Sequence, residues 1–210
     1  MSYFSAIIIT AVESYLLGSI SFGLIFTRLF DKIDIRTVGS GNTGMTNVLR
    51  CAGIWPGILT GICDFFKGFI GISVGRLLAD AAGMDRTVCV YVAATAALLG
   101  HIFPLYFGFH GGKGVMTTAG ISLQINPLLL VAELAVFFAV VFKTRIVSLA
   151  SVIAACCMPV AALLISVIQG NSPWMPLAYS LFTALVILWT HRTNISRLKN
   201  GTESKFEMKK

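Results

Sequence analysis

The chain has 210 residues, of which 56% are hydrophobic and only 12% are charged, and its mean hydropathy is +0.84. A soluble domain carries about twice that charged fraction. This composition therefore excludes an ordinary soluble domain and indicates a protein that uses the bilayer as its solvent. We interpret the net charge of +7 as a topology signal and an attraction to anionic lipid, not as a nucleic-acid-binding surface.

Seven apolar segments follow one another along the chain, and they predict an all-α polytopic membrane protein with about seven transmembrane helices. The fourth segment is short, because a dozen helical residues reach only ~18 Å across a ~30 Å hydrocarbon core. A turn at Asn126 separates it from the fifth, because Pro127 disfavours helix at the residue before it. The segments are 3–30, 54–79, 88–109, 114–125, 128–142, 146–168 and 174–190.

The charged residues assign the two sides of the membrane. With seven spans and the N-terminus outside, one side collects most of the lysines and arginines, and the other keeps only Arg76 and Arg86. Cytoplasmic loops carry such an excess of positive charge, so we expect the C-terminus to be cytoplasmic. Joining the fourth and fifth segments would put the C-terminal tail on the opposite side from Arg50 and Lys113, which favours seven spans over six.

Four polar stretches then fall on the cytoplasmic side, in loops near residues 31–53, 108–116, 143–151 and 190–210. Two of them are rich in glycine and carry a cation. Glycine lets backbone amides approach a ligand, and successive amides make an anion-binding nest that a following helix N-terminus strengthens. Phosphate is the ligand that suits such loops. The stretches read GSGNTGMTNVLR (39–50), HGGKGV (110–115), RIVSLAS (145–151) and HRTNISRL (191–198).

The remaining side chains argue against two classes of site, a nucleotide-binding P-loop and a metal centre. The pattern of a phosphate-binding P-loop is absent, because no hydroxyl follows the lysine of HGGKGV and no strand precedes it, and this argues against an ATPase. The carboxylates lie outside the four stretches and, like the five cysteines, lack metal-ligand spacing. We therefore expect no metal and no cofactor. Neutral hydrogen-bond donors in the first stretch are Ser40, Asn42, Thr46 and Asn47.

Three histidines and one buried ion pair need an interpretation. His191 shares a helix face with Asn194, and its place beside phosphate-type loops favours a role in ligand binding. We interpret His101 as a polar cap that ends a span, and His110 as a source of extra charge for the second loop when protonated. Asp64 and Lys67 form an i,i+3 pair within a span, for which a functional role and a structural tie both stay open.

Three stretches together resemble, in order and spacing, the signature regions of the bacterial acyl-phosphate:glycerol-3-phosphate acyltransferases. They are GSGNTGMTNVLR, GHIFPLYFGFHGGKGV and HRTNISRLKNGTESK, and the resemblance covers nearly the whole chain. It implies one integral membrane domain over residues 1–210, in the bacterial plasma (inner) membrane, with its active site facing the cytoplasm. It also implies transfer of an acyl chain from acyl phosphate to the 1-hydroxyl of glycerol 3-phosphate, giving lysophosphatidic acid and phosphate for phospholipid biosynthesis.

The resemblance also assigns residues. The acyl phosphate would be bound by Ser40, Gly41, Asn42, Gly44, Thr46, Gly111, Gly112 and Gly114. Glycerol 3-phosphate would be bound by Arg50, Lys113, Ser151, His191 and Asn194. Lys113, Arg50 and His191 would be the catalytic residues, with Arg50 and Lys113 taking phosphate charge.

This chain departs from the family pattern at three positions. Thr43 stands where the family usually has proline, and we expect a looser loop. Met45 stands in place of alanine, and we expect added bulk beside the bound phosphate. His110 stands in place of lysine, which removes a fixed charge.

The reaction itself fits these residues. An acyl phosphate has a good leaving group, so the enzyme needs charge neutralisation, orientation of two anions and an apolar path for the acyl chain. The released phosphate can accept the hydroxyl proton, and His191 is the alternative acceptor. The competing interpretation is a membrane transporter of a phosphorylated or anionic metabolite, although the polar stretches gather at one face and no inverted repeat is visible. An intramembrane serine protease fits less well, because the residues before Gly41 do not read G-x-S-G.

Overall fold

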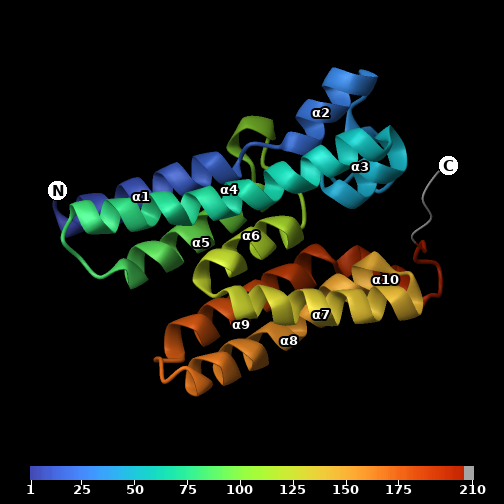
Figure 1. The fold of residues 1–210 in the computed structure, drawn as a ribbon. Coiled ribbons are helices and arrows are strands. Elements are labelled where there is room, and N and C mark those ends of the chain that lie inside the picture. Colours follow the sequence, from blue (N-terminus) through green and yellow to red (C-terminus); the bar gives the residue numbers. More distant parts are fainter. Residues whose placement is uncertain (206–210) are drawn as a thin grey trace. The chain divides into compact units, whose positions relative to one another are not determined.

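The computed structural model describes residues 1–205, and every regular element in that range is a helix. The chain forms two compact units, one covering Met1–Gln124 and the other beginning at Ile125. Figure 1 shows long, roughly parallel or antiparallel helices within each unit. The all-α prediction is therefore confirmed.

The first unit contains six helices and two short 3-10 turns. Two loops interrupt this helical framework, one before α3 and one before α6, and both carry the glycine-rich stretches. The elements are α1 (Tyr3–Gly18), α2 (Phe22–Asp31), η1 (Ile35–Thr37), α3 (Met45–Ala52), α4 (Ile54–Ala81), α5 (Arg86–Ile102), η2 (Leu105–Phe107) and α6 (Val115–Ile125).

Glycines set the close approach of the helices in this unit. A Cβ atom on Gly18 of α1 would lie 2.3 Å from the Ala97 carbonyl oxygen of α5, and a Cβ on Gly100 of α5 would lie 2.3 Å from the Tyr15 carbonyl oxygen of α1. Each helix therefore presents a glycine to the other's backbone. Small residues at such interfaces are how membrane helices pack without a hydrophobic driving force between them.

The first apolar segment forms two helices instead of one. The chain leaves helical geometry after Gly18 and re-enters it at Phe22. Lys67 of α4 reaches this break, where its Nζ donates a hydrogen bond to the Ile20 carbonyl oxygen at 2.9 Å. Hydropathy does not reveal the break, because its residues are as compatible with a membrane as the helices on either side.

The second unit contains four helices: α7 (Pro127–Thr144), α8 (Val147–Ile168), α9 (Trp174–Thr190) and α10 (Arg192–Lys199). The predicted turn before α7 is confirmed. Asn126 has extended backbone geometry, its side chain accepts a hydrogen bond from the Leu128 amide, and Pro127 opens the helix. Pro127 suits this first position because the amide it lacks would be unpaired there.

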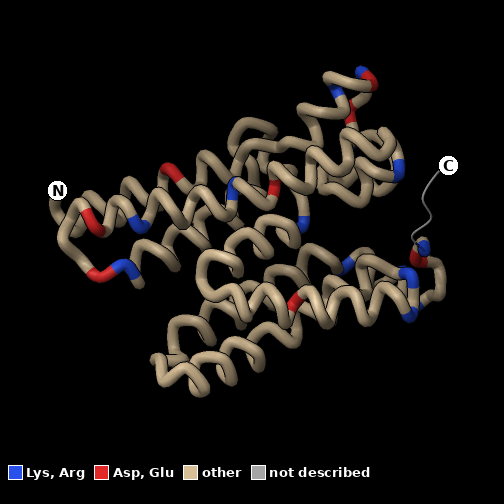
Figure 2. The backbone as a smooth tube through the Cα atoms, in the orientation of Figure 1, with Lys and Arg blue, Asp and Glu red and all other residues tan. Residues whose placement is uncertain are grey.

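Five segments of the described chain are long and apolar enough to cross a membrane, and a sixth is reached if α9 and α10, bent by 62°, count as one span. Helix α6, with 11 residues, is too short to qualify. In the first unit, Figure 2 shows charged residues gathered mainly at the two ends of the long helices, with few between them. This distribution is the one expected of helices that cross an apolar layer.

Candidate active site

A buried amide side chain holds the first glycine-rich loop in shape. Asn47 accepts a hydrogen bond from the Ser40 amide at 2.9 Å, and its Nδ2 donates to the carbonyl oxygens of Asn42 at 2.9 Å and Val38 at 3.2 Å. The left-handed backbone of Gly39, with φ at 60°, brings the loop so close that a Cβ there would lie 2.4 Å from Asn47 Oδ1. Asn47, which the sequence suggested as a ligand donor, is instead the scaffold of the loop.

The loop also satisfies several of its own amides. Gly41 donates to the Val38 carbonyl at 3.0 Å, and Gly44 donates to Asn42 Oδ1 at 2.9 Å. These amides are therefore occupied in the present geometry. The helix N-terminus is different: within residues 1–205, Thr46 makes no hydrogen bond through its amide or its hydroxyl. Unpaired amides at a helix N-terminus attract anions.

Helix α3 divides its side chains among three faces. Asn47 and Cys51 face the loop, since both lie within 3 Å of a Cβ built on Gly39. Met45 and Leu49 face α4. The third face carries Thr46 and, one turn later, Arg50, which share it because i and i+4 align on a helix. Arg50 is exposed and makes no ion pair in the described part of the chain.

Met45 packs away from the loop. A Cβ on Gly61 of α4 would lie 2.5 Å from the Met45 sulfur, and one on Gly57 would lie 2.4 Å from Leu49 Cγ. The two glycines accommodate these side chains one helical turn apart. The Met45 side chain therefore occupies space made by Gly61, and the added bulk expected beside the bound phosphate stays a prediction. Thr43 is buried, and its carbonyl oxygen would lie 1.9 Å from a Cβ on Gly23.

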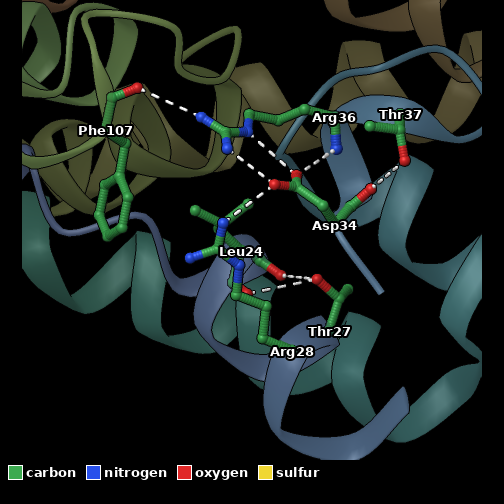
Figure 3. A network of polar contacts seen from close by, with 8 residues as sticks. Leu24, Thr27, Arg28, Asp34, Arg36, Thr37 and Phe107 are labelled. Atoms are coloured by element: carbon green, nitrogen blue, oxygen red, sulfur yellow. Dashed lines mark hydrogen bonds and ion pairs between the residues drawn. The ribbon is translucent and has the colours of Figure 1, made fainter. Parts of the chain in front are cut away.

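An ion cluster joins the segment before the first glycine-rich loop to η2, which precedes the second loop. Asp34 Oδ2 lies 2.9 Å from Arg28 and 2.7 Å from Arg36, and Arg36 also reaches the Phe107 carbonyl oxygen at 3.5 Å, as Figure 3 shows. Hydrogen bonds from Arg36 hold the pKa of the Asp34 carboxyl well below its usual range, with Arg28 adding to the effect. Asp34 therefore stays ionised, and the two arginines are partly neutralised by it.

The second glycine-rich loop is held by the end of α5. The Gly111 amide donates to the Ile102 carbonyl and the Gly112 amide to the His101 carbonyl, each at 3.1 Å. The loop lies so close to α5 that a Cβ on Gly112 would lie 2.0 Å from His101 Nε2. The prediction of His101 as a simple polar cap misses this contact with the loop.

Lys113 follows directly and is half-buried between two buried glycines, two residues before α6 begins. Gly114 needs its freedom of backbone here, because its φ is 88°. His110 is exposed, with Nδ1 2.6 Å from the Gly108 carbonyl oxygen. The predicted members of this loop thus form one compact turn at the start of α6.

The second unit holds the other predicted site residues. His191 lies at the junction of α9 and α10 and is 2% exposed, with Nδ1 2.9 Å from the Ile187 carbonyl oxygen. A carbonyl only accepts hydrogen bonds, so Nδ1 carries the proton and Nε2 is the ring's remaining polar atom. Ser151 of α8 is buried and donates to the Val147 carbonyl at 3.0 Å. Asn194 is also buried.

Glu203 organises this region, and the sequence reasoning missed it. Its Oε1 accepts hydrogen bonds from Ser148 at 2.7 Å and Asn194 at 2.6 Å, and its Oε2 lies 2.6 Å from Arg197. Burial raises the pKa of Glu203, but the hydrogen bonds from these three residues prevail and leave it below its ordinary value. The available signal was a single carboxylate within the basic HRTNISRLKNGTESK stretch.

No group of three or more His, Cys, Asp or Glu side chains in the described chain has the arrangement of a metal site. The predicted residues fall instead into two sets, each assembled within its own unit. The first unit holds those of the two glycine-rich loops, and the second holds Ser151, His191 and Asn194 with Glu203.

The fold defines the class of this protein as all-helical, with several helices long and apolar enough to cross a membrane. Its family follows from sequence: the chain matches the model of the family described as glycerol-3-phosphate acyltransferase over residues 8–201, and it belongs to that family. It is 41% identical to the glycerol-3-phosphate acyltransferase of Clostridioides difficile (strain 630) over all of both chains. It is 40% identical to that of Syntrophomonas wolfei, covering 92% of this chain and 94% of the relative.

Two solved structures share the fold. They are crystal structures of PlsY (YgiH), an integral membrane glycerol 3-phosphate acyltransferase, in a glycerol 3-phosphate form and a lysophosphatidic acid form. The first has a TM-score of 0.82 at 36% identity, and the second 0.80 at 34%, each covering 96% of both chains. The family resemblance carried by the three signature stretches is thereby confirmed.

Proposed function

We propose that this protein transfers an acyl chain from acyl phosphate to the 1-hydroxyl of glycerol 3-phosphate, giving lysophosphatidic acid and free phosphate. The observation that carries the proposal is the outward face of α3, where the unpaired Thr46 amide and hydroxyl share one helix face with an exposed Arg50. A helix N-terminus and a guanidinium on one face recognise phosphate. Membership of the glycerol-3-phosphate acyltransferase family supports the reaction class.

The first unit would bind the acyl phosphate. The two loops bring small residues to the N-termini of α3 and α6, where the Thr46 amide is unpaired, and Arg50 and Lys113 supply positive charge for the phosphoryl group. Bidentate hydrogen bonding by arginine suits the planar spread of phosphate oxygens. The residues proposed to line this site are Ser40, Gly41, Asn42, Gly44, Thr46, Gly111, Gly112 and Gly114.

Glycerol 3-phosphate would be bound by Ser151, His191 and Asn194 of the second unit, together with Arg50 and Lys113. Support comes from the burial of the three second-unit residues and from the Glu203 hydrogen bonds that fix Asn194. The hydrogen bond from Nδ1 to the Ile187 carbonyl oxygen fixes the orientation of the His191 ring. An imidazole held in this way is a suitable partner for the hydroxyl or the phosphate of glycerol 3-phosphate.

The reaction needs no covalent enzyme intermediate. The 1-hydroxyl oxygen forms a bond to the acyl carbon, the bond from that carbon to the phosphate oxygen breaks, and the departing phosphate takes the hydroxyl proton. The protein stabilises the charge that collects on the leaving phosphate, and holds the two substrates in reacting geometry. His191 contributes binding in this scheme, not proton abstraction.

The proposed topology has seven spans, with the N-terminus outside and the C-terminus cytoplasmic, in the plasma (inner) membrane. The seven are formed by α1 with α2, α4, α5, α6, α7, α8 and α9. Helix α6 measures only about 16 Å at 1.5 Å per residue. The end of the loop before it, where Gly112 and Gly114 are buried, would complete the crossing, because irregular backbone is tolerated at membrane depth where protein covers it. The two units would then make one membrane domain.

Purified protein, assayed with acyl phosphate and radiolabelled glycerol 3-phosphate, tests the reaction. We expect lysophosphatidate and phosphate in equal amounts, unaffected by chelation of divalent metal, and poor transfer from acyl thioesters. Arg50→Ala and Lys113→Ala should each lower the rate about ten- to hundredfold, the effect of one charge-assisted hydrogen bond. Arg50→Lys should fail too, because a point charge does not replace a planar fork. Wild-type rates in the alanine variants would overturn this assignment.

His191→Ala separates binding from proton transfer. At saturating acyl phosphate we expect a higher KM for glycerol 3-phosphate with kcat little changed. A general base would instead lose ~10²–10⁴ in kcat at a nearly constant KM. A pure kcat loss would assign the proton to His191.

Topology is tested with cysteines introduced into a cysteine-free background at Ser172, Asp85 and Ser204. In intact cells an impermeant thiol reagent should label the first two from outside and leave the third unlabelled. Labelling at Ser204 before lysis would overturn the seven-span orientation.

A further inference from the structure

Three ionisable side chains lie together inside the first unit, away from the outward face of α3. Asp64 and Lys67 are one turn apart on α4, with Lys67 Nζ 2.9 Å from Asp64 Oδ1, and both side chains are at most 3% exposed. His101 of α5 turns its Nδ1 toward the same Asp64 oxygen at 3.6 Å. Lys67 already neutralises the charge of Asp64, so His101 is not needed to neutralise that carboxylate.

The cluster contacts two other parts of the first unit, which are the break between α1 and α2 and the second glycine-rich loop. Lys67 donates to the Ile20 carbonyl in the break between α1 and α2, and its Nζ lies 5.9 Å from the centre of the Phe22 ring. The Lys67 contact has a purely structural explanation, because it pairs a carbonyl that lies in a helix break. The contact between His101 and the second glycine-rich loop has no such explanation.

At that contact, the His101 ring fills the space where a side chain on Gly112 would begin. A Gly112 Cβ would lie 2.0 Å from Nε2 and 2.7 Å from Cε1, while the Gly112 amide donates to the His101 carbonyl at 3.1 Å. The loop backbone therefore rests on the edge of the ring. Lys113 is the next residue, so any rotation of the ring changes the support of the backbone next to Lys113.

We propose that Asp64 is a positioning residue for acyl transfer: it orients the His101 ring, and the ring sets the loop backbone that carries Lys113. This inference rests on the proposed role of Lys113 in binding phosphate charge. It differs from a structural tie in one respect, since a tie needs Asp64 only as the partner of Lys67, whereas positioning needs Asp64 as the partner of His101.

A matched pair of double variants separates these roles. D64N/K67M and D64L/K67M both remove the ion pair, and asparagine and leucine have the same branching. Only asparagine keeps an oxygen that can accept a hydrogen bond from His101 Nδ1. We expect equal thermal midpoints in detergent, near-normal transfer by D64N/K67M and a loss of about 10²-fold by D64L/K67M, the effect of misplacing a catalytic group by about 1 Å. Equal rates in the two variants would overturn the proposal.

A double-mutant cycle tests whether the effect passes through Lys113. If His101 acts by placing Lys113, H101A should slow the wild-type enzyme but add nothing to K113A. Independent, multiplying effects would overturn the inference while leaving the role of Lys113 intact. A wild-type rate in K113A alone would instead overturn the proposed function, so the two failures are distinguishable.

A third comparison holds even if the ion-pair variants do not fold. G112A places a methyl group against the ring and should lose most activity, and H101A/G112A removes the ring and should recover part of it. A double variant no more active than G112A would mean that the methyl group acts on the substrate and not on His101, which would overturn the proposal.

Discussion

The two glycine-rich loops of the first unit are alike in composition but are held by different parts of the chain. Asn47, seven residues from Ser40, holds the first loop from inside: it accepts a hydrogen bond from the Ser40 amide and donates to the Asn42 and Val38 carbonyls. The second loop is held from outside, by the carbonyls and the ring at the end of α5. The first loop is therefore held by a residue of the helix that directly follows it, whereas the position of the second loop depends on α5, the helix that precedes it.

The largest effect should come from breaking the internal support of the first loop. Asn47→Asp keeps the oxygen that accepts from Ser40 but replaces the donors to Asn42 and Val38 with an oxygen. Each buried carbonyl left unpaired costs about 1–3 kcal/mol, and the new carboxylate repels both. We expect transfer to fall by about 10²-fold or more through displacement of the loop, with a lower thermal midpoint.

Asn171→Asp is the matched control for this change, because Asn171 is exposed and makes a single 3.4 Å side-chain hydrogen bond. It should leave rate and thermal midpoint near those of the wild type. Normal transfer by Asn47→Asp would show that the loop does not depend on its internal hydrogen bonds.

The second loop should be broken by crowding it against α5. A Cβ on Gly111 would lie 2.0 Å from the His101 carbonyl oxygen and 2.7 Å from Pro104 Cδ, whereas one on Gly108 would meet nothing within 4 Å. Gly111→Ala should lower transfer about tenfold or more, because the loop must move away from the helix end. Gly108→Ala should cost only about 1 kcal/mol for its left-handed backbone. Equal rate losses would mean that contact with α5 does not place this loop.

The sequence predicted both loops and their cations because glycine, asparagine and charge are local signals. It also predicted the turn at Asn126, the all-helical class and the family. The break at Ile20 and the contact between His101 and Gly112 were missed, because both depend on side chains that arrive from another helix. Glu203 was missed for the same reason, since its partners Ser148 and Asn194 lie on α8 and α10.

Glu203 extends the comparison to the second unit, where this residue of the C-terminal segment accepts a hydrogen bond from the predicted site residue Asn194. Its folded-state pKa is lowered, so its contribution to stability is present above about pH 4.3, the ordinary pKa of glutamate, and is lost as the pH falls through the lower folded value. Glu203→Gln should reduce stability at pH 7 by about 1–3 kcal/mol. Thermal midpoints recorded from pH 7 downward should converge for the two proteins; a constant gap would contradict the assignment.

The smallest effect on the transfer rate is expected at Met45. Its substitution tests whether the position of the first loop is independent of α4. The Met45 side chain packs against Gly61 of α4, so Met45→Ala should open a gap between α3 and α4 without touching the outward face of α3. We expect a stability loss of about 1–2 kcal/mol, below the range for a fully buried methionine because the side chain is only half-buried, and an almost unchanged rate. Adding Gly61→Ala should refill part of the gap and restore part of the thermal midpoint, because its Cβ would occupy the place of the lost sulfur. A several-fold change in rate with an unchanged midpoint would instead put the methionine side chain beside the bound phosphate, and the first loop would then depend on α4 as the second depends on α5.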